Sequence, residues 1–294
     1  MNIILNLSPL AIFIIMLGVG MSLSIKNFFD VFKDLKTLLV GLFSQMVILP
    51  CVGFLFVIFL QVDTSLKLGI ILITCVPSAV TSNYITKLVD GNVALSVSLT
   101  AITACLSFIS IPFILIIVAP FVIDRANIFQ ELNFVKMSLL LLLVTTTPVL
   151  LGIYIKKKFS IFVEKINKFY AIFSLIIFIT IICAAWYSEW NAIAILYKSI
   201  GFLVLLLAAA VLTVSYAFVS LLSLNEANKK TIIIESFIQN AAMAIIVGGS
   251  VFGSESGYLA IAALYALLQY KILLTFWALN KFFLKSIHLK SFTD

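Results

Sequence analysis

Apolar runs of about 18 residues or more, the length of a membrane-spanning helix, recur from one end of this 294-residue chain to the other. A helix of that length crosses the ~30 Å hydrocarbon core of a bilayer. The chain is 63% hydrophobic and only 11% charged, whereas a soluble domain carries about 25% charged residues. The sequence therefore predicts an all-α, multi-pass membrane protein with no separate soluble domain.

Nine membrane-spanning helices are predicted from these runs, at residues 6–24, 34–60, 66–90, 92–118, 134–156, 169–186, 200–223, 230–252 and 256–282. Of the 19 Lys and Arg residues, 14 fall on one side of the membrane, four fall on the other side and Lys271 lies within a span. Because cytoplasmic loops are rich in Lys and Arg, the N-terminus is expected outside and the C-terminus in the cytoplasm. We expect the chain in the plasma (inner) membrane of a microbe, without a cleaved signal peptide, because no basic residue precedes the first apolar run.

An offset of 157 residues relates the two halves of the chain, because it places Asn83 on Asn240 and the first four helices near the last four. Helices related by this offset run in opposite directions. The pattern predicts a five-plus-five inverted repeat whose first helix is missing, an architecture typical of transporters.

Two predicted helices are interrupted at matching places. The third contains Pro77 and then polar residues up to Asn83, and the eighth contains Gln239 and Asn240. Proline removes a backbone donor and disfavours helix in the residue before it. The alternative is a simple kink with Ser/Thr back-bonding. The matching polar position in the second half favours broken helices, which point to a transporter's central site.

Glu235 lies in the apolar stretch 231–252, where a carboxylate costs at least ~2.5 kcal/mol unless it faces a cavity, an ion or a partner. Gln239 follows one helical turn later, and Ser96 and Thr100 share a helix face elsewhere. Back-bonding is the alternative for these two hydroxyls, and an interhelical hydrogen bond is the alternative for Gln45. One carboxylate among neutral oxygens suits Na⁺, since Mg²⁺ or Ca²⁺ usually draws more carboxylates.

Other classes of protein fit poorly. The net charge of +7 sits in short runs between apolar segments, which argues against nucleic acid as a partner. All four cysteines lie in apolar segments, and the chain has one histidine, His288. We find no Ser/His/Asp set, metal-ligand cluster or glycine-rich phosphate loop, so we expect no enzyme. An ion channel does not explain an inverted repeat with two broken helices.

Four motifs carry a resemblance to a known family: GVGMSLSIKNF at 18–28, Gln45 with Pro50, CVPSAVTSNYITKLVDGNVALSVSLTAIT at 75–103, and ESFIQN at 235–240. In order and spacing the chain resembles the bile acid:sodium symporter family from about residue 7 to residue 280. The resemblance implies a single transporter domain over 1–294, built from a panel and a core with two broken, crossing helices. It places the panel at about 1–33 and 134–199, and the core at about 34–133 and 200–294. Some members have nine helices and lack the first.

The resemblance also implies which residues bind Na⁺. One sodium site would be formed by Ser82, Asn83, Ser96, Thr100 and Glu235. A second would be formed by the side chains of Gln45, Glu235 and Gln239 and the backbone carbonyls of Ser236 and Ile238. Asn240 would lie at the substrate, beside the crossing point.

The chain departs from the family pattern on the substrate side. The departures are Ser78-Ala79 in place of Gly-Gly, Val80 in place of threonine, Phe237 in place of a small residue and Tyr270 in place of asparagine. These changes predict a reshaped pocket, and bile acid itself is not the expected ligand.

Lys271 is about ten residues, or roughly 15 Å, from the Lys281 end of its predicted helix. Snorkelling to the surface is one interpretation. Lys271 is otherwise expected to bind the carboxylate or sulfonate of a substrate, or to pair with Glu235 and replace a sodium ion. We favour anion binding, because the full set of sodium ligands is present.

The sequence thus predicts a sodium-coupled symporter that imports a small organic anion by alternating access in the lipid bilayer. The alternative is a sodium-independent exporter or facilitator on the same fold, with a Glu235–Lys271 charge pair. No oligomeric state follows from the sequence, which is compatible with a monomer.

Overall fold

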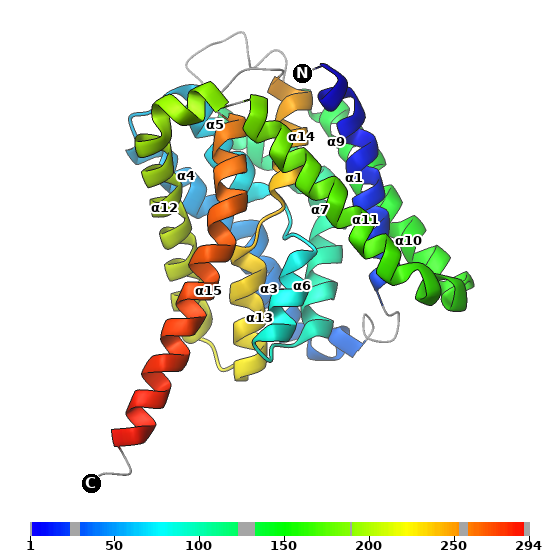
Figure 1. Cartoon of the computed structure of the whole chain (residues 1–294), viewed down its shortest axis with the longest axis vertical. Coiled ribbons are helices and arrows are strands. Elements are labelled where there is room, and N and C mark those ends of the chain that lie inside the picture. The colour runs from blue at the N-terminus through cyan, green and yellow to red at the C-terminus, as the bar shows by residue number, and fades with distance from the viewer. Residues whose placement is uncertain (1, 24–29, 123–132, 189, 253–257, 291–294) are drawn as a thin grey trace.

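The computed structural model describes residues 2–23, 30–122, 133–188, 190–252 and 258–290. These residues form an all-helical bundle with no strands (Figure 1). The helices up to the middle of the chain are α1 (Asn2–Ser22), η1 (Phe32–Asp34), α3 (Leu35–Phe43), η2 (Ser44–Ile48), α4 (Leu49–Phe59), α5 (Thr64–Cys75), α6 (Thr81–Leu88) and α7 (Val93–Val122). The later helices are α9 (Phe134–Leu141), η3 (Leu142–Thr146), α10 (Thr147–Lys158), α11 (Ser160–Ser188), α12 (Trp190–Ser220), α13 (Glu226–Phe237), α14 (Ala241–Phe252) and α15 (Tyr258–Lys290).

Several of these helical segments are long and apolar enough to cross a bilayer. Within the described residues four qualify by length and composition: Phe32–Phe59, Val93–Val118, Phe134–Lys158 and Ile200–Ser220. Shorter apolar segments include Pro9–Ser22, Thr64–Cys75 and Leu259–Leu273. The composition and these helices are those of a multi-pass membrane protein.

Two helical paths contain a π-helical turn shortly before a proline. η2 precedes Pro50 in α4, and η3 precedes Pro148 in α10. Proline supplies no backbone donor and its ring crowds the preceding turn, and the wider π turn accommodates both effects without ending the helix. Such turns recur at functional sites, and η2 carries Gln45.

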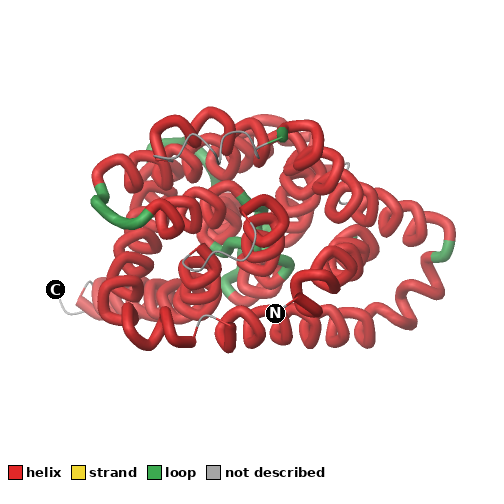
Figure 2. Tube along the Cα trace, turned by 90° about the horizontal axis from the view of Figure 1, so that it is seen from above, coloured by secondary structure: helices red, strands yellow, loops and turns green. Residues whose placement is uncertain are grey.

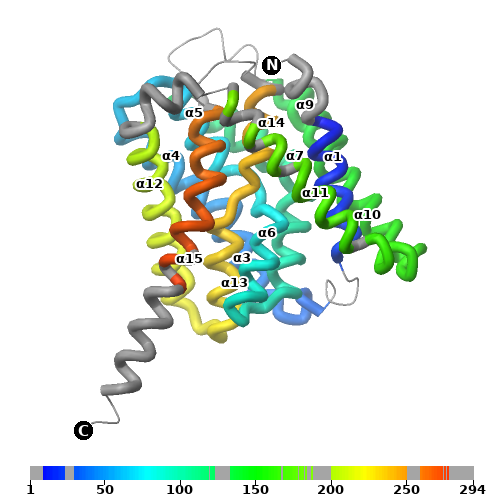
Figure 3. Tube along the Cα trace, in the orientation of Figure 1, coloured from blue at the N-terminus to red at the C-terminus, as the bar shows by residue number. Residues whose placement is uncertain are grey.

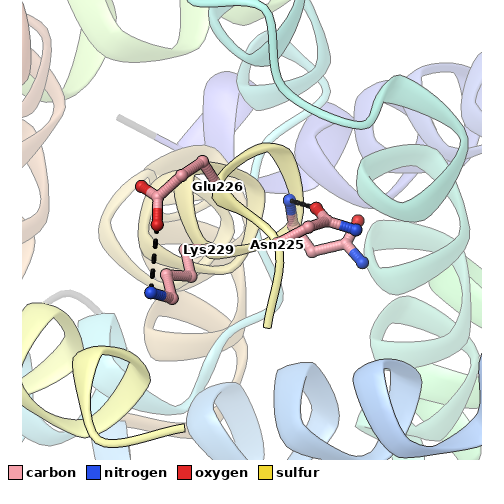
Figure 4. Close-up of polar contacts among 4 residues, drawn as sticks. Asn225, Glu226 and Lys229 are labelled. Carbon is pink, nitrogen blue, oxygen red and sulfur yellow. Dashed lines mark hydrogen bonds and ion pairs between the residues drawn. The ribbon is translucent and has the colours of Figure 1, made fainter. Parts of the chain in front are cut away.

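Helix boundaries differ from the predicted spans where a helix continues beyond its apolar part. α12 begins at Trp190, well before the predicted start at 200, and α13 begins at Glu226 rather than at 230. The side chain of Asn225 accepts a hydrogen bond from the backbone N–H of Asn228 (2.8 Å), and Glu226 pairs with Lys229 (3.0 Å), as Figure 4 shows. Hydropathy marks entry into the membrane, whereas an N-cap and an i,i+3 ion pair fix the true start of α13.

α1, α10 and α11 lie side by side at one edge of the molecule (Figures 1 and 3). Close packing of α1 on α10 depends on two glycines. A Cβ on Gly20 would lie 2.1 Å from the carbonyl oxygen of Val149, and one on Gly152 would lie 2.4 Å from that of Leu17. Small residues let membrane helices approach to backbone contact, and here they join the two helices into one unit.

Two helices are interrupted in the middle of the bundle. One path stops at the end of α5 and resumes at α6, and the other stops at the end of α13 and resumes at α14. The break predicted at Pro77 is confirmed, as is the break predicted at Gln239 and Asn240. Figure 2 shows non-helical segments at the centre, surrounded by helices.

Candidate functional site

The two breaks meet and pair with each other. The backbone N–H of Ala79 donates to the carbonyl of Ile238 (3.2 Å), and the N–H of Asn240 donates to the carbonyl of Pro77 (3.0 Å). Between them Ser78 and Gln239 form an isolated antiparallel β-bridge. Backbone groups freed from the helices are therefore satisfied within the protein, as an apolar environment demands.

We call the place where the two breaks meet the crossing. Two buried side chains of α15, which the sequence did not single out, form hydrogen bonds to it. The amide of Gln269 accepts from the N–H of Gln239 (2.8 Å) and donates to its carbonyl (3.3 Å). The hydroxyl of Tyr265 donates to the carbonyl of Phe237 (3.0 Å). Both side chains bind backbone atoms of the second break and hold it in place.

Glu235, in the last turn of α13, is fully buried with 0% of its surface exposed. Each carboxylate oxygen accepts hydrogen bonds from two hydroxyls. Ser78 (2.5 Å) and Thr100 (2.8 Å) donate to Oε2, and Ser96 (2.5 Å) and Ser82 donate to Oε1. The donors come from the first break, α6 and α7, so three elements converge on one side chain.

The residues predicted for the first sodium site are brought together here. Ser82, Ser96 and Thr100 contact Glu235 directly. The Oδ1 of Asn83 lies 2.7 Å from the hydroxyl of Ser96, whose single proton can go either to Asn83 or to Glu235. Ser78 joins this cluster, although the sequence placed it among the changes on the substrate side. Its signal was its place in the polar run after Pro77.

The groups that form hydrogen bonds with Glu235 are neutral hydroxyls. Among the described residues no Lys or Arg forms a salt bridge with Glu235, and no group of three or more His, Cys, Asp or Glu could hold a metal ion. A hydroxyl that donates its one proton to a carboxylate still has two lone pairs. One carboxylate surrounded by such oxygens has the chemistry to hold a hard monovalent cation, and it lacks the further carboxylates of a divalent site.

A second set of buried polar atoms adjoins the cluster. Both amide atoms of Gln45 and the Oε1 of Gln239 are buried, and in the described part of the chain they have no hydrogen-bond partner. The Nε2 of Gln239 donates to the carbonyl of Ser236 (2.6 Å). The hydroxyl of Ser236 in turn lies 2.8 Å from that of Ser44, the neighbour of Gln45 on η2.

Of the residues predicted for the second sodium site, Gln239 and Ser236 contact each other, whereas no hydrogen bond of the described residues joins Gln45 to them. The carbonyl of Ile238 accepts from Ala79 and keeps a second lone pair. Unpaired buried polar atoms are rare and costly, so the side-chain oxygens of Gln45 and Gln239 are candidate ligand atoms.

A cavity of about 270 Å³ lies between α1 and α11 on one side and the first break with α6 on the other. Val80 and Asn240, both predicted to face substrate, line it. The opposite wall includes Gly18, the first residue of the GVGMSLSIKNF motif, and also Tyr170 and Ser174, which the sequence did not single out. None of the described residues that line the cavity is charged; their polar groups are hydroxyls and the Asn240 amide.

Tyr270 contacts a residue that lines the cavity but does not line it itself. Its hydroxyl lies 2.7 Å from that of Thr81, which is the lining residue.

Lys271 is exposed and does not line the cavity. Gln269 faces the crossing, and a residue two positions later points to the opposite side of an α-helix. No salt bridge of the described residues joins Lys271 to Glu235, so the charge pair of the alternative interpretation is not formed in this conformation. The exposed position of Lys271 is compatible with the snorkelling interpretation.

The chain is similar in sequence to known families of membrane transporters. The model of the Sodium Bile acid symporter family matches residues 9–195. The chain is 25% identical over 278 residues to YocS of Bacillus subtilis, an uncharacterized sodium-dependent transporter, covering 90% of this chain and 81% of YocS. It is 27% identical over 257 residues to BASS1 of Arabidopsis thaliana, a probable chloroplastic sodium/metabolite cotransporter, covering 85% of this chain and 60% of BASS1. It is 28% identical over 145 residues to the human ileal sodium/bile acid cotransporter, covering 49% of this chain and 41% of that protein.

Proposed function

The chain belongs to the Sodium Bile acid symporter family of membrane transporters, and we propose from this that it imports a small organic anion together with Na⁺. Membership identifies it as a transporter and not an enzyme. The observation that carries the sodium coupling is Glu235, a fully buried carboxylate held by four hydroxyls and, among the described residues, by no cation. A bound Na⁺ would neutralise this charge, which is costly at membrane depth.

The proposal assigns two sodium sites. Glu235 would share one ion with Ser82, Asn83, Ser96 and Thr100. The second ion would take the unpaired oxygens of Gln45 and Gln239 together with Glu235 and the carbonyls of Ser236 and Ile238. The supporting observation for the second site is that the side-chain oxygens of Gln45 and Gln239 are buried and, in the described part of the chain, have no hydrogen-bond partner.

The substrate would occupy the cavity lined by Val80 and Asn240. Its volume of about 270 Å³ is close to the lower end of ligand pockets, which favours a small anion over a bile acid. Hydroxyls and the Asn240 amide would orient a carboxylate or sulfonate there. The neighbouring sodium ions would supply the positive charge that the described lining residues lack.

Sodium and substrate would be coupled through the crossing. Asn240 and Val80 line the cavity. Ser78 and Ser82, which donate to Glu235, lie on the same broken path as Val80, and Glu235 lies on the same broken path as Asn240. An ion that tightens the crossing would therefore order the substrate residues, and each ligand would raise the affinity of the other by the same factor.

The proposal keeps the nine-helix inverted repeat, with the N-terminus outside, the C-terminus inside and the chain in a microbial plasma membrane. The panel, at about 1–33 and 134–199, would contain α1, α9, η3, α10, α11 and the start of α12, and the other helices with the rest of α12 would form the core. The cavity lies between panel helices and the first break, where alternating access would open it to each side in turn.

The test begins with thermal unfolding of the purified protein in Na⁺, Li⁺ and K⁺, alone and with small carboxylates and sulfonates. We expect Na⁺ to stabilise the protein and to increase the effect of one class of anion. That anion is then offered to proteoliposomes, where uptake should require an inward Na⁺ gradient. Uptake that persists at the same rate when K⁺ replaces Na⁺ contradicts sodium coupling and supports a facilitator.

A further inference from the structure

Ser78 belongs both to the crossing and to the cluster around Glu235. Its backbone pairs with Gln239 in the β-bridge. Its hydroxyl lies 2.5 Å from the Oε2 of Glu235 and 2.9 Å from the hydroxyl of Thr100, and the residue is 2% exposed. Among the hydroxyls bonded to Glu235, those of Ser82, Ser96 and Thr100 lie on the helices α6 and α7.

The chemistry of a hydroxyl allows Ser78 to act on a cation without releasing Glu235. One proton stays on the carboxylate, and the two lone pairs remain for an ion. The family resemblance implies that glycine is common at this position. A glycine would leave Thr100 as the donor to Oε2 among the contacts described. We propose that Ser78 is a ligand of the transported cation and links occupancy of the ion site to the crossing. This inference rests on the proposed sodium coupling.

The backbone around Ser78 explains how that link would work. Pro77 on one side accepts from Asn240, and Ala79 on the other side donates to Ile238. Val80, two residues beyond Ser78, lines the cavity together with Asn240. A small movement of Ser78 toward an ion is therefore passed to both breaks and to two cavity residues.

The experiment measures equilibrium binding of ²²Na⁺ to the purified protein, with Li⁺ as a competitor. Ser78→Ala and Ser78→Gly both remove the hydroxyl, and size-exclusion chromatography confirms that each variant is folded. The control is Ser98→Ala on α7, because Ser98 is buried and its hydroxyl has no partner in the described part of the chain. We expect a Na⁺ affinity at least tenfold weaker for the Ser78 variants and unchanged for the control.

The ratio of Li⁺ to Na⁺ affinity separates a ligand from a structural residue. Li⁺ is smaller and needs fewer oxygens, so loss of one ligand should weaken Na⁺ binding more than Li⁺ binding. Unchanged Na⁺ affinity in both Ser78 variants overturns the proposal, as does an equal loss for both ions. If the unmodified protein shows no saturable Na⁺ binding, the proposed function fails first.

Discussion

The backbone N–H of Asn240 donates to the carbonyl of Pro77 at 3.0 Å, which joins the two broken helices directly. Pro77 lacks an N–H, and its carbonyl lies beyond the end of α5, so this carbonyl needs a partner from elsewhere. Asn240 supplies it from the other half of the chain. Pro77, which breaks the path from α5 to α6, is thus bonded to Asn240, which lines the cavity between α1, α11 and α6.

Glu235→Gln tests whether the carboxylate is the ion's counter-charge. We expect Na⁺ to lose its stabilising effect on the variant. In K⁺ alone the variant should unfold at a higher temperature than the unmodified protein, because an ionised residue at membrane depth costs ~2.5–3.5 kcal/mol and the amide N–H₂ can donate to hydroxyls that lose an acceptor. Thermal unfolding monitored by intrinsic fluorescence measures both effects. A Na⁺-induced shift as large as that of the unmodified protein excludes Glu235 as a ligand.

Gln45→Leu tests the second ion site. The amide atoms of Gln45 have no partner in the described residues, so leucine should leave stability in K⁺ unchanged or raise it by ~1–3 kcal/mol. The Hill coefficient for Na⁺ should fall from near two to near one. Titration of Na⁺-dependent uptake or of ²²Na⁺ binding measures it.

The matched control for Gln45→Leu is Gln269→Leu, since both glutamines are buried. Gln269 bonds both backbone groups of Gln239, so this substitution should destabilise the protein by ~1–3 kcal/mol in any salt. A cooperative Na⁺ response that survives in Gln45→Leu argues against the second site.

Sequence patterns located residues of the candidate site where the signal lies within one helix. Pro77 marked a helix break, Glu235 was a costly buried charge, and Ser96 and Thr100 shared a helix face. In the structure Pro77 lies where the two breaks meet, and Ser96 and Thr100 both contact Glu235. These signals follow from the chemistry of one residue or from a spacing of four. The prediction needed no knowledge of how the helices pack.

Contacts between helices were not predictable in the same way. Ser78 and Gln269 meet their partners only through the arrangement of distant segments in space. Lys271 attracted attention as an isolated charge, yet the rotation of α15 turns Gln269 inward and Lys271 outward. On α11, Tyr170 and Ser174 are single polar groups among apolar ones, with no motif to indicate a cavity wall.

Gly18→Ala tests the wall of the cavity. A Cβ at Gly18 would lie 2.6 Å from the ring of Tyr170, and the hydroxyl of that tyrosine is fixed to the carbonyl of Ile14 at 2.5 Å. The ring must therefore shift within the cavity wall, and we expect substrate affinity to fall about tenfold, or ~1.4 kcal/mol, with ²²Na⁺ affinity unchanged. Gly201→Ala is the control, because its Cβ would have no atom within 4 Å. Equal substrate affinity in both variants removes this wall from the site.

Lys271→Met distinguishes the remaining roles of the lysine. Lys271 is exposed, does not line the cavity and is not paired with Glu235, so we expect uptake kinetics and Na⁺ binding within twofold of the unmodified protein. Thermal stability should rise slightly, because a charge leaves the surface of a membrane helix.

Lys230→Met serves as the comparison for Lys271→Met. The ammonium of Lys230 donates to the carbonyl of Val89 at 3.0 Å and lies over the ring of Trp277, so its loss should cost ~1–3 kcal/mol. If Lys271 binds the substrate anion in another state of the transport cycle, Lys271→Met will instead raise the KM for substrate tenfold or more while Na⁺ binding stays intact. A stronger dependence of uptake on Na⁺ without a change in the KM for substrate would point to a transient pair with Glu235, because Na⁺ would then have to neutralise the carboxylate in place of the lysine. Uptake measured against substrate and Na⁺ concentration separates the three roles. Snorkelling leaves both constants unchanged, substrate binding changes the KM for substrate, and pairing changes the Na⁺ dependence.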